Sequence, residues 1–335
     1  FNIIRPVIYS EVPSGSGDPV YKNRSIAVVV PAYREELLIR PTLESIPDYV
    51  DRVYAVDDAS PDRTGAIIEE LAAADPRITP LHHPANRGVG GAIVSGYRQA
   101  LADRIDIVAV MAGDNQMDPA FLPELLDPVV EGRVDYAVGN RLINPLFRKG
   151  MSKWRFVGNS VLTLLTKFAS GYWQLMDPQN GYTAISRRAL ETISLDAIYP
   201  RYGYCNDLLV WLNTYGFRVK NVPHPARYGL ERSKIKYSTY IVRLLWLLFN
   251  AFLWRMKMKY VVLSFHPLVF FYAFGSLFTF LGFLFGVYAL YFKFVLDNPI
   301  FVPAVVSVIL FALGVQFILF AMLFDMQEEN KGTWY

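Results

Sequence analysis

Two long apolar segments near the C-terminus place the strongest limit on how this chain can fold. Residues Leu268–Phe292 and Ile300–Phe324 contain no Asp, Glu, Lys or Arg. Each segment is longer than the ~20 residues that a helix needs to cross ~30 Å of hydrocarbon. Helices buried in a large soluble core would show a polar face at helical period, and neither segment has one. The pattern predicts two transmembrane helices within 266–325, a short loop at Lys293–Pro299, and a C-terminal tail over 326–335.

The charged residues beside these segments predict how the helices lie in the membrane. Arg255, Lys257 and Lys259 precede the first segment, whereas the loop carries Lys293 and Asp297. Basic residues concentrate on the cytoplasmic side of membrane proteins. The bias therefore predicts an integral membrane protein whose N-terminal domain faces the cytoplasm, with both chain ends on the same side.

Residues 236–265 predict a helix that lies along the membrane surface. The apolar stretch Thr239–Trp254 is too short to span a bilayer. Polar residues recur in this region at a spacing of seven: Lys236, Arg243, Asn250 and Lys257. They fall on one stripe of a helix, which suits an amphipathic helix with its stripe near the headgroups and its rings in the acyl boundary. A helix packed on the core of the N-terminal domain is the alternative.

Composition limits the kinds of protein that this chain can be. Hydrophobic residues make up 53% and aromatic residues 15% of the 335 residues, which is high for a soluble enzyme. A net charge of only +3 argues against a general nucleic-acid-binding protein, so no nucleic-acid partner is expected. The single cysteine, Cys205, excludes an intramolecular disulfide framework, and four scattered histidines give no zinc-binding spacing.

Strand and helix signals alternate ahead of the membrane segments. Short apolar runs that predict strands fall near residues 26–30, 52–56, 105–111 and 135–139. Helical patterns separate them: Gly65–Ala74, Gly90–Ala102 and Ala120–Glu131. Repeated strand–helix units favour an α/β domain over 25–235, with a mostly parallel sheet and helices on both faces. Residues 1–24, which contain SGSGDP, lack periodicity and predict a flexible arm without a signal peptide.

One predicted strand, near 105–111, runs into a loop rich in oxygen donors. This loop reads AGDNQMDP and contains Asp114, Gln116 and Asp118. In open α/β sheets ligands bind at the carboxyl ends of strands. Proteins hold Mg²⁺ with one or two carboxylates together with substrate phosphates, so the loop predicts a site for Mg²⁺ or Mn²⁺. The alternative is a polar turn that opens a helix, with Asp118 as the N-cap and Pro119 after it.

Two further strand ends carry polar side chains. Asp57 and Asp58 follow the second predicted strand in the motif VDDASPD, and the first strand runs into PAYRE, which contains Pro31, Tyr33 and Glu35. These strand ends predict a cleft for a polar ligand that arrives with a metal ion. The alternative is that the two aspartates only cap the turn that follows them.

Six motifs in a fixed order carry a resemblance to a known family. They are PAYRE, VDDASPD, NRGVGGA, AGDNQMDP, VGNRL and DPQNGYTAISRRAL. In this order and spacing the chain resembles the family 2 glycosyltransferases, specifically the polyprenyl-phosphate sugar synthases of the dolichol-phosphate mannose and glucose synthase type. The resemblance covers roughly Ser25–Lys236. It implies a domain of the fold that the family calls GT-A.

The resemblance also implies a reaction. A membrane-bound inverting enzyme would move a hexose from a nucleotide sugar, of the GDP-mannose or UDP-glucose type, to polyprenyl or dolichyl phosphate. Its cofactor would be Mg²⁺ or Mn²⁺, because charge builds on the leaving oxygen as the sugar bond breaks. Its partners would be the nucleotide sugar, the lipid phosphate and the bilayer. The sequence leaves the sugar, the base, the lipid length and homo-oligomer formation open.

Roles for the donor and the metal follow from the matching motifs. The resemblance implies that Asp114 and Gln116 bind the metal. Many relatives carry a further Asp where this chain has Ala112, which removes a carboxylate from the site. The implied donor-binding residues are Pro31, Tyr33, Glu35, Asp57, Asp58, Asp114, Arg232 and Lys234. NRGVGGA lacks the signatures of a Walker loop and of a dinucleotide fingerprint, so its glycines predict close helix packing instead.

Cations are expected around the acceptor. A lipid phosphate is already anionic near neutral pH, so the enzyme must bring two anions together rather than supply a strong base. The implied acceptor-binding residues are Arg141, Lys153, Arg155 and Asn159. The implied catalytic residues are Asp114, Arg141, Arg155 and Asp207. Solvated or headgroup-facing cations are the alternative for the basic residues, and capping the helix Leu208–Tyr215 is the alternative for Asp207.

Two other functions compete with this hypothesis. A processive polysaccharide synthase usually has a Gln-x-x-Arg-Trp motif and more spans, and this chain has neither. A catalytically inactive protein that binds sugar nucleotides at the membrane would account for Ala112. It would show no metal-dependent hydrolysis or transfer of the donor.

Overall fold

The sheet of the N-terminal domain places the predicted site residues along one edge. The computed structural model describes residues 21–143, 153–225, 237–296, 299 and 301–331. Within these ranges one sheet has seven strands in the order β3-β2-β1-β4-β6-β5-β7. The strands are β1 (Ile26–Ala32), β2 (Arg52–Asp57), β3 (Ile78–His82), β4 (Ile107–Val110), β5 (Tyr136–Asn140), β6 (Thr183–Ser186) and β7 (Val219–Pro223).

Most neighbouring strands of this sheet are parallel. β1 pairs in parallel with β2 on one side and β4 on the other, and β3 continues the parallel run beyond β2. Only β6 runs against its neighbours β4 and β5, while β7 is parallel to β5. The carboxyl ends of β2, β1 and β4 therefore lie side by side, at the edge where open α/β sheets bind ligands.

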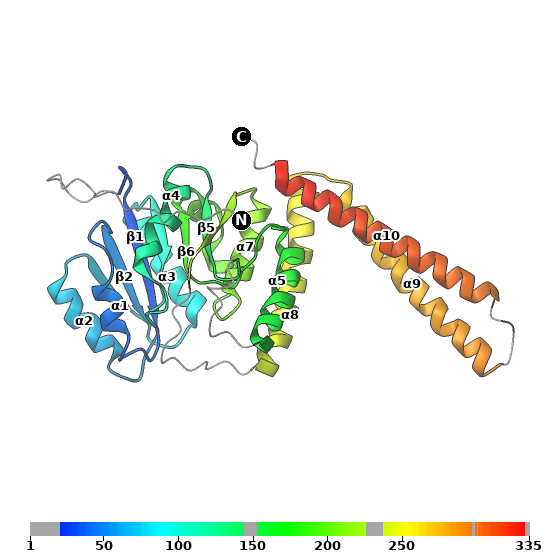
Figure 1. Cartoon of the computed structure of the whole chain (residues 1–335), viewed down its shortest axis with the longest axis horizontal. Coiled ribbons are helices and arrows are strands. Elements are labelled where there is room, and N and C mark those ends of the chain that lie inside the picture. The colour runs from blue at the N-terminus through cyan, green and yellow to red at the C-terminus, as the bar shows by residue number, and fades with distance from the viewer. Residues whose placement is uncertain (1–20, 144–152, 226–236, 297–298, 300, 332–335) are drawn as a thin grey trace, which may run out of the picture.

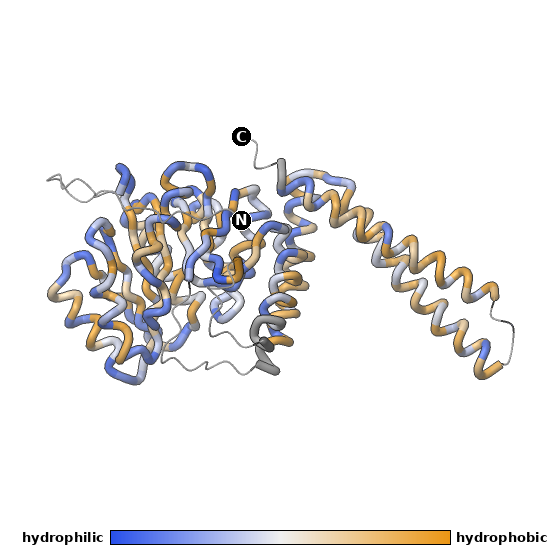
Figure 2. Tube along the Cα trace, viewed as in Figure 1, coloured by the Kyte–Doolittle hydropathy of each residue, from blue (hydrophilic) through white to orange (hydrophobic). Residues whose placement is uncertain are grey.

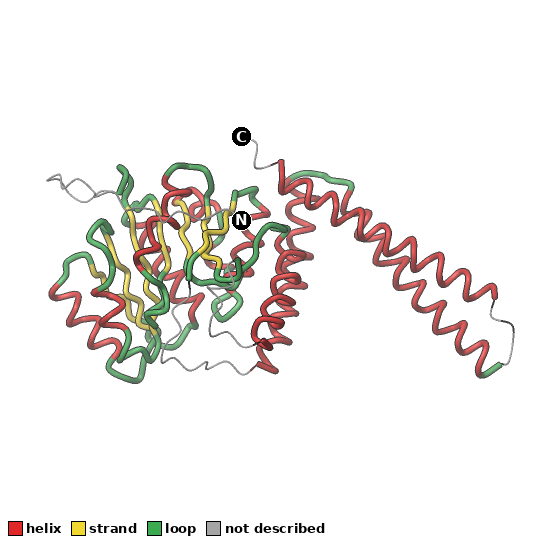
Figure 3. The backbone as a smooth tube through the Cα atoms, in the orientation of Figure 1, coloured by secondary structure: helices red, strands yellow, loops and turns green. Residues whose placement is uncertain are grey.

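Helices cover both faces of the sheet, as Figure 3 shows. Successive residues of a strand point to opposite faces. Val29 of β1 accordingly packs with residues of α3 and α7, whereas Val28 and Val30 pack with residues of α1, α2 and α4. The helices are α1 (Ile39–Glu44), α2 (Thr64–Ala74), α3 (Val89–Ala102), α4 (Leu122–Val130), α5 (Lys153–Ser170), α6 (Arg187–Thr192), α7 (Tyr204–Thr214), α8 (Tyr237–Lys257), α9 (Leu268–Phe294) and α10 (Phe301–Lys331).

The predicted α/β domain, with a mostly parallel sheet and helices on both faces, is confirmed. Strands β1, β2, β4 and β5 lie where the apolar runs predicted them. The sequence analysis missed β3, β6 and β7. β3 contains Pro80 and lies at an edge of the sheet, and β7 is a half-exposed strand at the other edge. Neither forms the continuous apolar run of a central parallel strand.

Helix α8 packs on the N-terminal domain with one face and exposes an apolar face elsewhere. Leu244 and Leu248 are buried beside Ala169 of α5, and Figure 1 shows α5 and α8 side by side. Its exposed apolar residues are Ile241, Val242, Leu245, Trp246, Phe249 and Leu253. α8 therefore has two apolar faces. The exposed face fits the predicted membrane-surface helix, and the buried face fits the alternative of a helix packed on the N-terminal domain.

Helices α9 and α10 form a hairpin that projects away from the N-terminal domain (Figure 1). By length and composition each can cross a membrane, as predicted. Only 22% and 11% of their apolar windows are buried, so they are not core helices of a soluble fold. Figure 2 shows hydrophobic residues along most of both helices. Between them, Ser307 Oγ donates a hydrogen bond to Gly282 O at 2.8 Å.

The stretch 326–335, which the sequence predicts to be a C-terminal tail, begins as a continuation of α10. Helix α10 continues without a break to Lys331. Glu329 explains the extension, because its carboxylate accepts hydrogen bonds from the backbone N–H groups of Trp173 (2.9 Å) and Gln174 (3.5 Å). The last turns of α10 are therefore docked on the N-terminal domain.

One of the basic residues used to orient the hairpin lies inside the protein. Arg255 is 0% exposed and forms an ion pair with Asp325 of α10. Lys259, in the π-helix Met258–Leu263, donates to Asn213 Oδ1 at 2.7 Å. Neither charge is a solvated flanking residue, so of the three basic residues only Lys257 is exposed. The cytoplasmic orientation thus rests on fewer surface charges than the sequence suggested.

Candidate active site

Three loops that carry predicted site residues meet at the carboxyl ends of β2, β1 and β4. Backbone hydrogen bonds join the loops: Asp58 N donates to Ala32 O (3.0 Å) and Gly113 N donates to Pro31 O (3.1 Å). Thr64 Oγ1 at the start of α2 accepts from Glu35 N at 2.9 Å. This edge carries Pro31, Tyr33, Glu35, Asp57, Asp58 and Asp114. The structure therefore brings these predicted donor-side residues together.

The Asp114 loop is held by its own backbone. Asp114 Oδ1 accepts a hydrogen bond from Gln116 N at 3.1 Å, and Asn115 between them has a left-handed φ of 56°. Asn is among the residues that tolerate this conformation, because its short polar side chain can bond locally. Ala112 N donates to Met117 Sδ at 3.2 Å and closes the turn. Asp114 and Gln116, both partly exposed, thus lie on one ordered loop.

The donors on this loop fit a cation that arrives with its substrate. The described residues contain no group of three or more His, Cys, Asp or Glu that could hold a metal ion. Asp114 offers a carboxylate and Gln116 an amide oxygen, while Ala112 offers no side-chain donor. Mg²⁺ is commonly bound by one or two carboxylates, substrate phosphates and water. Asp114 and Gln116 fit that mode of binding, with the remaining ligands supplied by a diphosphate and water.

Asp118 is the N-cap of a short helical turn, as the alternative interpretation of this loop predicted. Its Oδ1 accepts a hydrogen bond from Ala120 N at 3.0 Å, and Pro119 occupies the first position of the 3₁₀ turn Pro119–Phe121. The Asp118 carbonyl accepts from Tyr182 Oη at 3.0 Å, which ties the loop to β6. Asp118 is therefore an N-cap that holds the end of the Asp114 loop.

The two aspartates after β2 both organise loops. Asp58 is buried and accepts hydrogen bonds from the backbone N–H groups of Arg87 and Gly88, each at 2.8 Å, with His83 Nδ1 at 2.6 Å. Asp57 Oδ1 accepts from Ser60 N at 3.0 Å. Asp58 thus anchors the NRGVGGA motif where α3 begins. Asp57 thus caps the turn that follows it, whereas Asp58 does not, and donor binding by either aspartate stays a prediction.

Tyr202 lies close enough to the strand ends to sense the charge of two of their carboxylates. Its side chain is 55% exposed, and its pKa is raised by partial burial and by the carboxylates of Glu35 and Asp114. The segment before α7 that carries it is fixed, because Pro200 O accepts from Gly91 N at 2.8 Å. An aromatic ring near both carboxylates was not among the predicted site residues. Nothing in its sequence context distinguished it from other loop tyrosines.

Arg141 is held by a buried carboxylate. Its Nε and Nη2 donate to Asp177 Oδ2 (2.7 Å) and Oδ1 (3.0 Å), and its backbone N–H also donates to Oδ2 (3.2 Å). Asp177 is 0% exposed, so Arg141 is its charge partner. Such a bidentate pair fixes the guanidinium plane precisely in space while neutralising much of its charge. Acceptor binding by Arg141 stays a prediction, and the structure adds its pairing with Asp177.

Asn180 and His224 form a second buried pair that the sequence analysis missed. Asn180 Nδ2 lies 2.7 Å from His224 Nε2, and His224 Nδ1 lies 2.9 Å from Pro225 O. Burial lowers the pKa of His224, which fits a neutral ring that donates through Nδ1 and accepts through Nε2. A Cβ at Gly139 would lie 2.5 Å from the His224 ring. A lone histidine between two prolines carries no sequence signal for this role.

Asp207 is buried in the first turn of α7. It is 8% exposed, and its Oδ2 accepts a hydrogen bond from Tyr199 N at 2.8 Å. Burial raises the pKa of Asp207 to about 6. The neighbouring Asn206 donates to Thr166 Oγ1 of α5 at 2.6 Å. Asp207 thus fixes the segment before α7, and its catalytic role stays a prediction.

Several predicted site residues are placed only in part. Lys153, Arg155 and Asn159 lie on α5, but for the first two only the helical backbone is described. Asn159 is partly exposed on the same helix. Arg232 and Lys234 lie outside the described residues. Their predicted contacts with donor and acceptor stay predictions.

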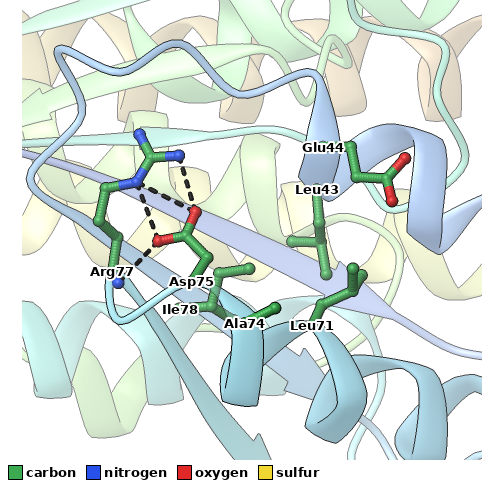
Figure 4. A pocket seen from close by; sticks show the side chains of 7 residues that line it. All are labelled: Leu43, Glu44, Leu71, Ala74, Asp75, Arg77 and Ile78. Atoms are coloured by element: carbon green, nitrogen blue, oxygen red, sulfur yellow. Dashed lines mark hydrogen bonds and ion pairs between the residues drawn. The ribbon is translucent and has the colours of Figure 1, made fainter.

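A separate small pocket lies away from this edge. Figure 4 shows its lining at the C-terminal ends of α1 and α2, around the start of β3. Its volume is about 240 Å³, below the usual range for ligand sites. Its charged residues Asp75 and Arg77 pair with each other at 2.8 Å. It lies at the amino-terminal edge of the parallel strands, so it is not part of the candidate site.

Comparison with known proteins decides the family. Residues 27–194, half of the chain, match the sequence profile of Glycosyl transferase family 2. The chain belongs to glycosyltransferase family 2. The matched region of this glycosyltransferase contains the Asp58, Asp114 and Arg141 loops, and it ends before α7.

Two relatives resemble this glycosyltransferase over about three fifths of its length. A UDP-N-acetylglucosamine–dolichyl-phosphate N-acetylglucosaminyltransferase from Methanococcus voltae is 28% identical over 214 residues, which is 60% of this chain and 85% of the relative. A polyprenol monophosphomannose synthase from Mycolicibacterium smegmatis is 33% identical over 229 residues, which is 64% of this chain and 82% of the relative.

A solved structure shows the same fold. Glucosyl-3-phosphoglycerate synthase from Mycobacterium tuberculosis, crystallised with Mg²⁺ and uridine diphosphate, matches with a TM-score of 0.53 at 21% identity. The match covers 75% of this glycosyltransferase and 86% of that chain. The expected GT-A type of fold is therefore confirmed, whereas the metal and nucleotide belong to the other protein.

Proposed function

We propose that this glycosyltransferase is membrane-bound and inverting, and that it moves a hexose from a nucleotide sugar to polyprenyl or dolichyl phosphate. The observation that carries the proposal is that one chain combines a polar edge suited to a nucleotide sugar with apolar helices suited to a membrane. Carboxylates from three neighbouring strand ends line a polar edge, and the same domain continues into an exposed apolar face on α8 and an apolar hairpin. The relatives named above support the acceptor, because one is named for dolichyl phosphate and the other for the synthesis of polyprenol monophosphomannose.

The donor half of the reaction is assigned to the β2-β1-β4 edge. Asp114 and Gln116 would hold Mg²⁺ or Mn²⁺, which would neutralise charge on the departing diphosphate. Glu35 and Asp57, at neighbouring strand ends, would bind the nucleoside. Tyr202, whose pKa is raised in part by Glu35 and Asp114, would contribute an aromatic ring to the donor site. A GDP-mannose or UDP-glucose type of donor fits these groups equally well.

The acceptor half of the reaction needs positioning more than base catalysis. A phosphate oxygen of the lipid would attack sugar C1 from the face opposite to the nucleoside diphosphate, so that the new C1–O bond forms as the old one breaks. Holding two anions in line is the main task, and fixed cations perform it. Arg141, fixed by Asp177, and the residues of α5 are assigned to that task.

The catalytic domain is proposed to face the cytoplasm. The exposed charge that precedes the hairpin is Lys257, whereas Arg255 is buried and Lys259 is partly buried. Exposed apolar residues of α8 would seat the domain on the membrane surface. The acceptor phosphate would then reach the cleft from the headgroup layer.

A donor screen tests the proposed function. The purified chain in detergent would receive a polyprenyl phosphate, Mn²⁺ and, one at a time, GDP-mannose, UDP-glucose and UDP-N-acetylglucosamine, with products read by mass. We expect one donor to give a lipid carrying a single sugar phosphate unit, and Asp114→Asn to abolish it. A polymer would favour the processive synthase. Absence of transfer and hydrolysis with every donor would favour an inactive binding protein.

A further inference from the structure

Arg255 joins three parts of the molecule at one buried point. It lies near the end of α8 and is 0% exposed. Its Nε donates to Ala169 O at 2.9 Å and its Nη2 to Phe168 O at 3.1 Å, both in the last turn of α5. The final carbonyls of a helix lack partners within the helix, and a cation there is favourable. Arg255 therefore caps the C-terminal end of α5.

The other side of the same guanidinium binds the hairpin. Arg255 Nη1 and Nη2 donate to Asp325 Oδ1 (2.8 Å) and Oδ2 (2.9 Å). Two parallel hydrogen bonds fix the orientation of the guanidinium relative to the carboxylate. Tyr260 Oη of the π-helix also donates to Asp325 Oδ1. Glu329, one turn further along α10, bonds the backbone of Trp173 just after α5. Both carboxylate oxygens of the buried Asp325 thus bind side chains of α8 and the π-helix.

Gly171 shows how tightly this point is built. It follows α5 with a left-handed φ of 77°, and a Cβ added there would collide with Arg255 Nη1. Only glycine adopts this conformation readily and leaves room for the guanidinium. The junction, which we define as Arg255, Asp325 and the carbonyls of Phe168 and Ala169, therefore leaves little freedom of movement.

We propose that the junction is a positioning device for the acceptor: it fixes the angle between the hairpin and α5, so that a phosphate anchored in the bilayer meets the cleft. The inference rests on the proposed function, because it concerns how the lipid phosphate reaches that site. α5 links the two places. Its C-terminal end is held by the junction, and its N-terminal part carries the predicted acceptor residues Lys153, Arg155 and Asn159.

The length of α5 makes its angle matter. Its 18 residues span about 27 Å at ~1.5 Å per residue. Tilting the hairpin and its bilayer by roughly 5° relative to α5 would shift a bilayer-anchored phosphate by about 2 Å over this length, whereas a soluble phosphate would keep its position. Misplacing reacting groups by ~1 Å costs about 100-fold in rate. A buried ion pair of fixed geometry suits this task, because an apolar contact would permit a range of angles.

Comparing transfer to two acceptors distinguishes a loss of acceptor positioning from a general loss of protein stability. The first is a long-chain polyprenyl phosphate in lipid vesicles that hold the full-length chain, and the second is a water-soluble short-chain isoprenyl phosphate. Asp325→Asn should lower kcat/KM for the long-chain acceptor about tenfold or more, and change kcat/KM for the short one and the donor Kd less than about twofold. Gln327→Ala, which changes an exposed polar side chain on the same helix as Asp325, is the matched control and should change neither.

A double variant keeps the test valid if Asp325→Asn folds poorly. Replacing both partners, as Arg255→Met with Asp325→Leu, removes the buried charges together and should restore thermal stability. It should not restore transfer to the long-chain acceptor, because the fixed angle is lost. Recovery of that transfer together with stability would overturn the proposal. An equal loss with both acceptors would overturn it too.

A distance measurement gives a readout that does not depend on activity. Spin labels at Val161 on α5 and Val308 on α10, both exposed, should give one narrow distance distribution in the wild type and a broader one in Asp325→Asn. An unchanged distribution would show that the junction does not set the angle. If the wild type transfers sugar to neither acceptor, the proposed function fails, while the distances still decide whether the junction positions α5.

Discussion

Burial of Asp207 should make the stability of the catalytic domain depend on pH. Its pKa is raised from an ordinary value of 3.8 to about 6, because burial disfavours the charged carboxylate more than the hydrogen bond from Tyr199 N favours it. Between these two values the folded state holds a proton that the unfolded state releases. Stability therefore falls as pH rises from about 4 to 6, and stays level above that. Asp207→Asn should remove this dependence, since an amide oxygen can accept the same hydrogen bond.

The size of the effect follows from the two pKa values. Each pKa unit corresponds to about 1.4 kcal/mol, which limits the full difference to about 3 kcal/mol. Between pH 4.5 and 7.5 the wild type should lose about 2 kcal/mol relative to Asp207→Asn. For a domain of this size that amounts to roughly 4–8 °C in Tm.

Thermal unfolding followed by tryptophan fluorescence at both pH values would measure this difference. The control is Asp48→Asn, because the Asp48 side chain is fully exposed and should give the same pH dependence as the wild type. Parallel pH profiles for the wild type and Asp207→Asn would refute the reasoning. They would mean that Asp207 is hydrated and titrates like an ordinary carboxylate.

Three further predictions concern the metal, the acceptor and the topology. Asp114→Asn should remove most divalent-dependent turnover and leave folding intact, and Gln116→Ala should cost less, as titrations with limiting Mn²⁺ would show. Arg155→Ala should lower transfer by roughly 10 to 150-fold, the equivalent of ~1.5–3 kcal/mol for a bond to a charged group, with donor affinity by calorimetry unchanged. If donor binding falls too, Arg155 is not an acceptor residue. A cysteine at Leu296 should react with a membrane-impermeant label from the side opposite to one at Lys331, and labelling from one side would exclude a transmembrane hairpin.

The parts of the fold that sequence predicted are those that local pattern determines. Apolar runs located β1, β2, β4 and β5, and charge-free length located α9 and α10. The polar residues at strand ends were also predictable, because the carboxyl ends of parallel strands share one edge. β3 and β7 were missed because edge strands need no continuous apolar run.

Pairings between distant residues were beyond the reach of sequence pattern. Arg141 and Asp177 belong to two separate motifs, and nothing in their spacing shows that one neutralises the other. Arg255 looked like a surface charge that flanks a membrane span, yet Asp325, 70 residues later, takes it into the interior. Periodicity reports which face of an element is apolar, but it does not report the partner of a buried charge.

The same limit applied to single carboxylates in the candidate site. Asp58 and Asp118 follow strands as site residues do, yet Asp58 bonds backbone N–H groups of the loop before α3, and Asp118 bonds one of its own loop. Sequence could state capping as an alternative and could not choose, since ligand binding and capping both place a short acidic side chain after a strand. Only the positions of the backbone N–H groups around each carboxylate distinguish capping from ligand binding.

The stereochemistry of a single product tests the central claim most directly. With the donor that the screen selects, the sugar–lipid product formed in vesicles would be isolated, weighed by mass spectrometry and its anomeric linkage read by NMR. An α-linked nucleotide sugar should give one sugar joined through a β-linked phosphate to the lipid. Free sugar, a sugar polymer, or a product that retains the α-linkage would contradict the account.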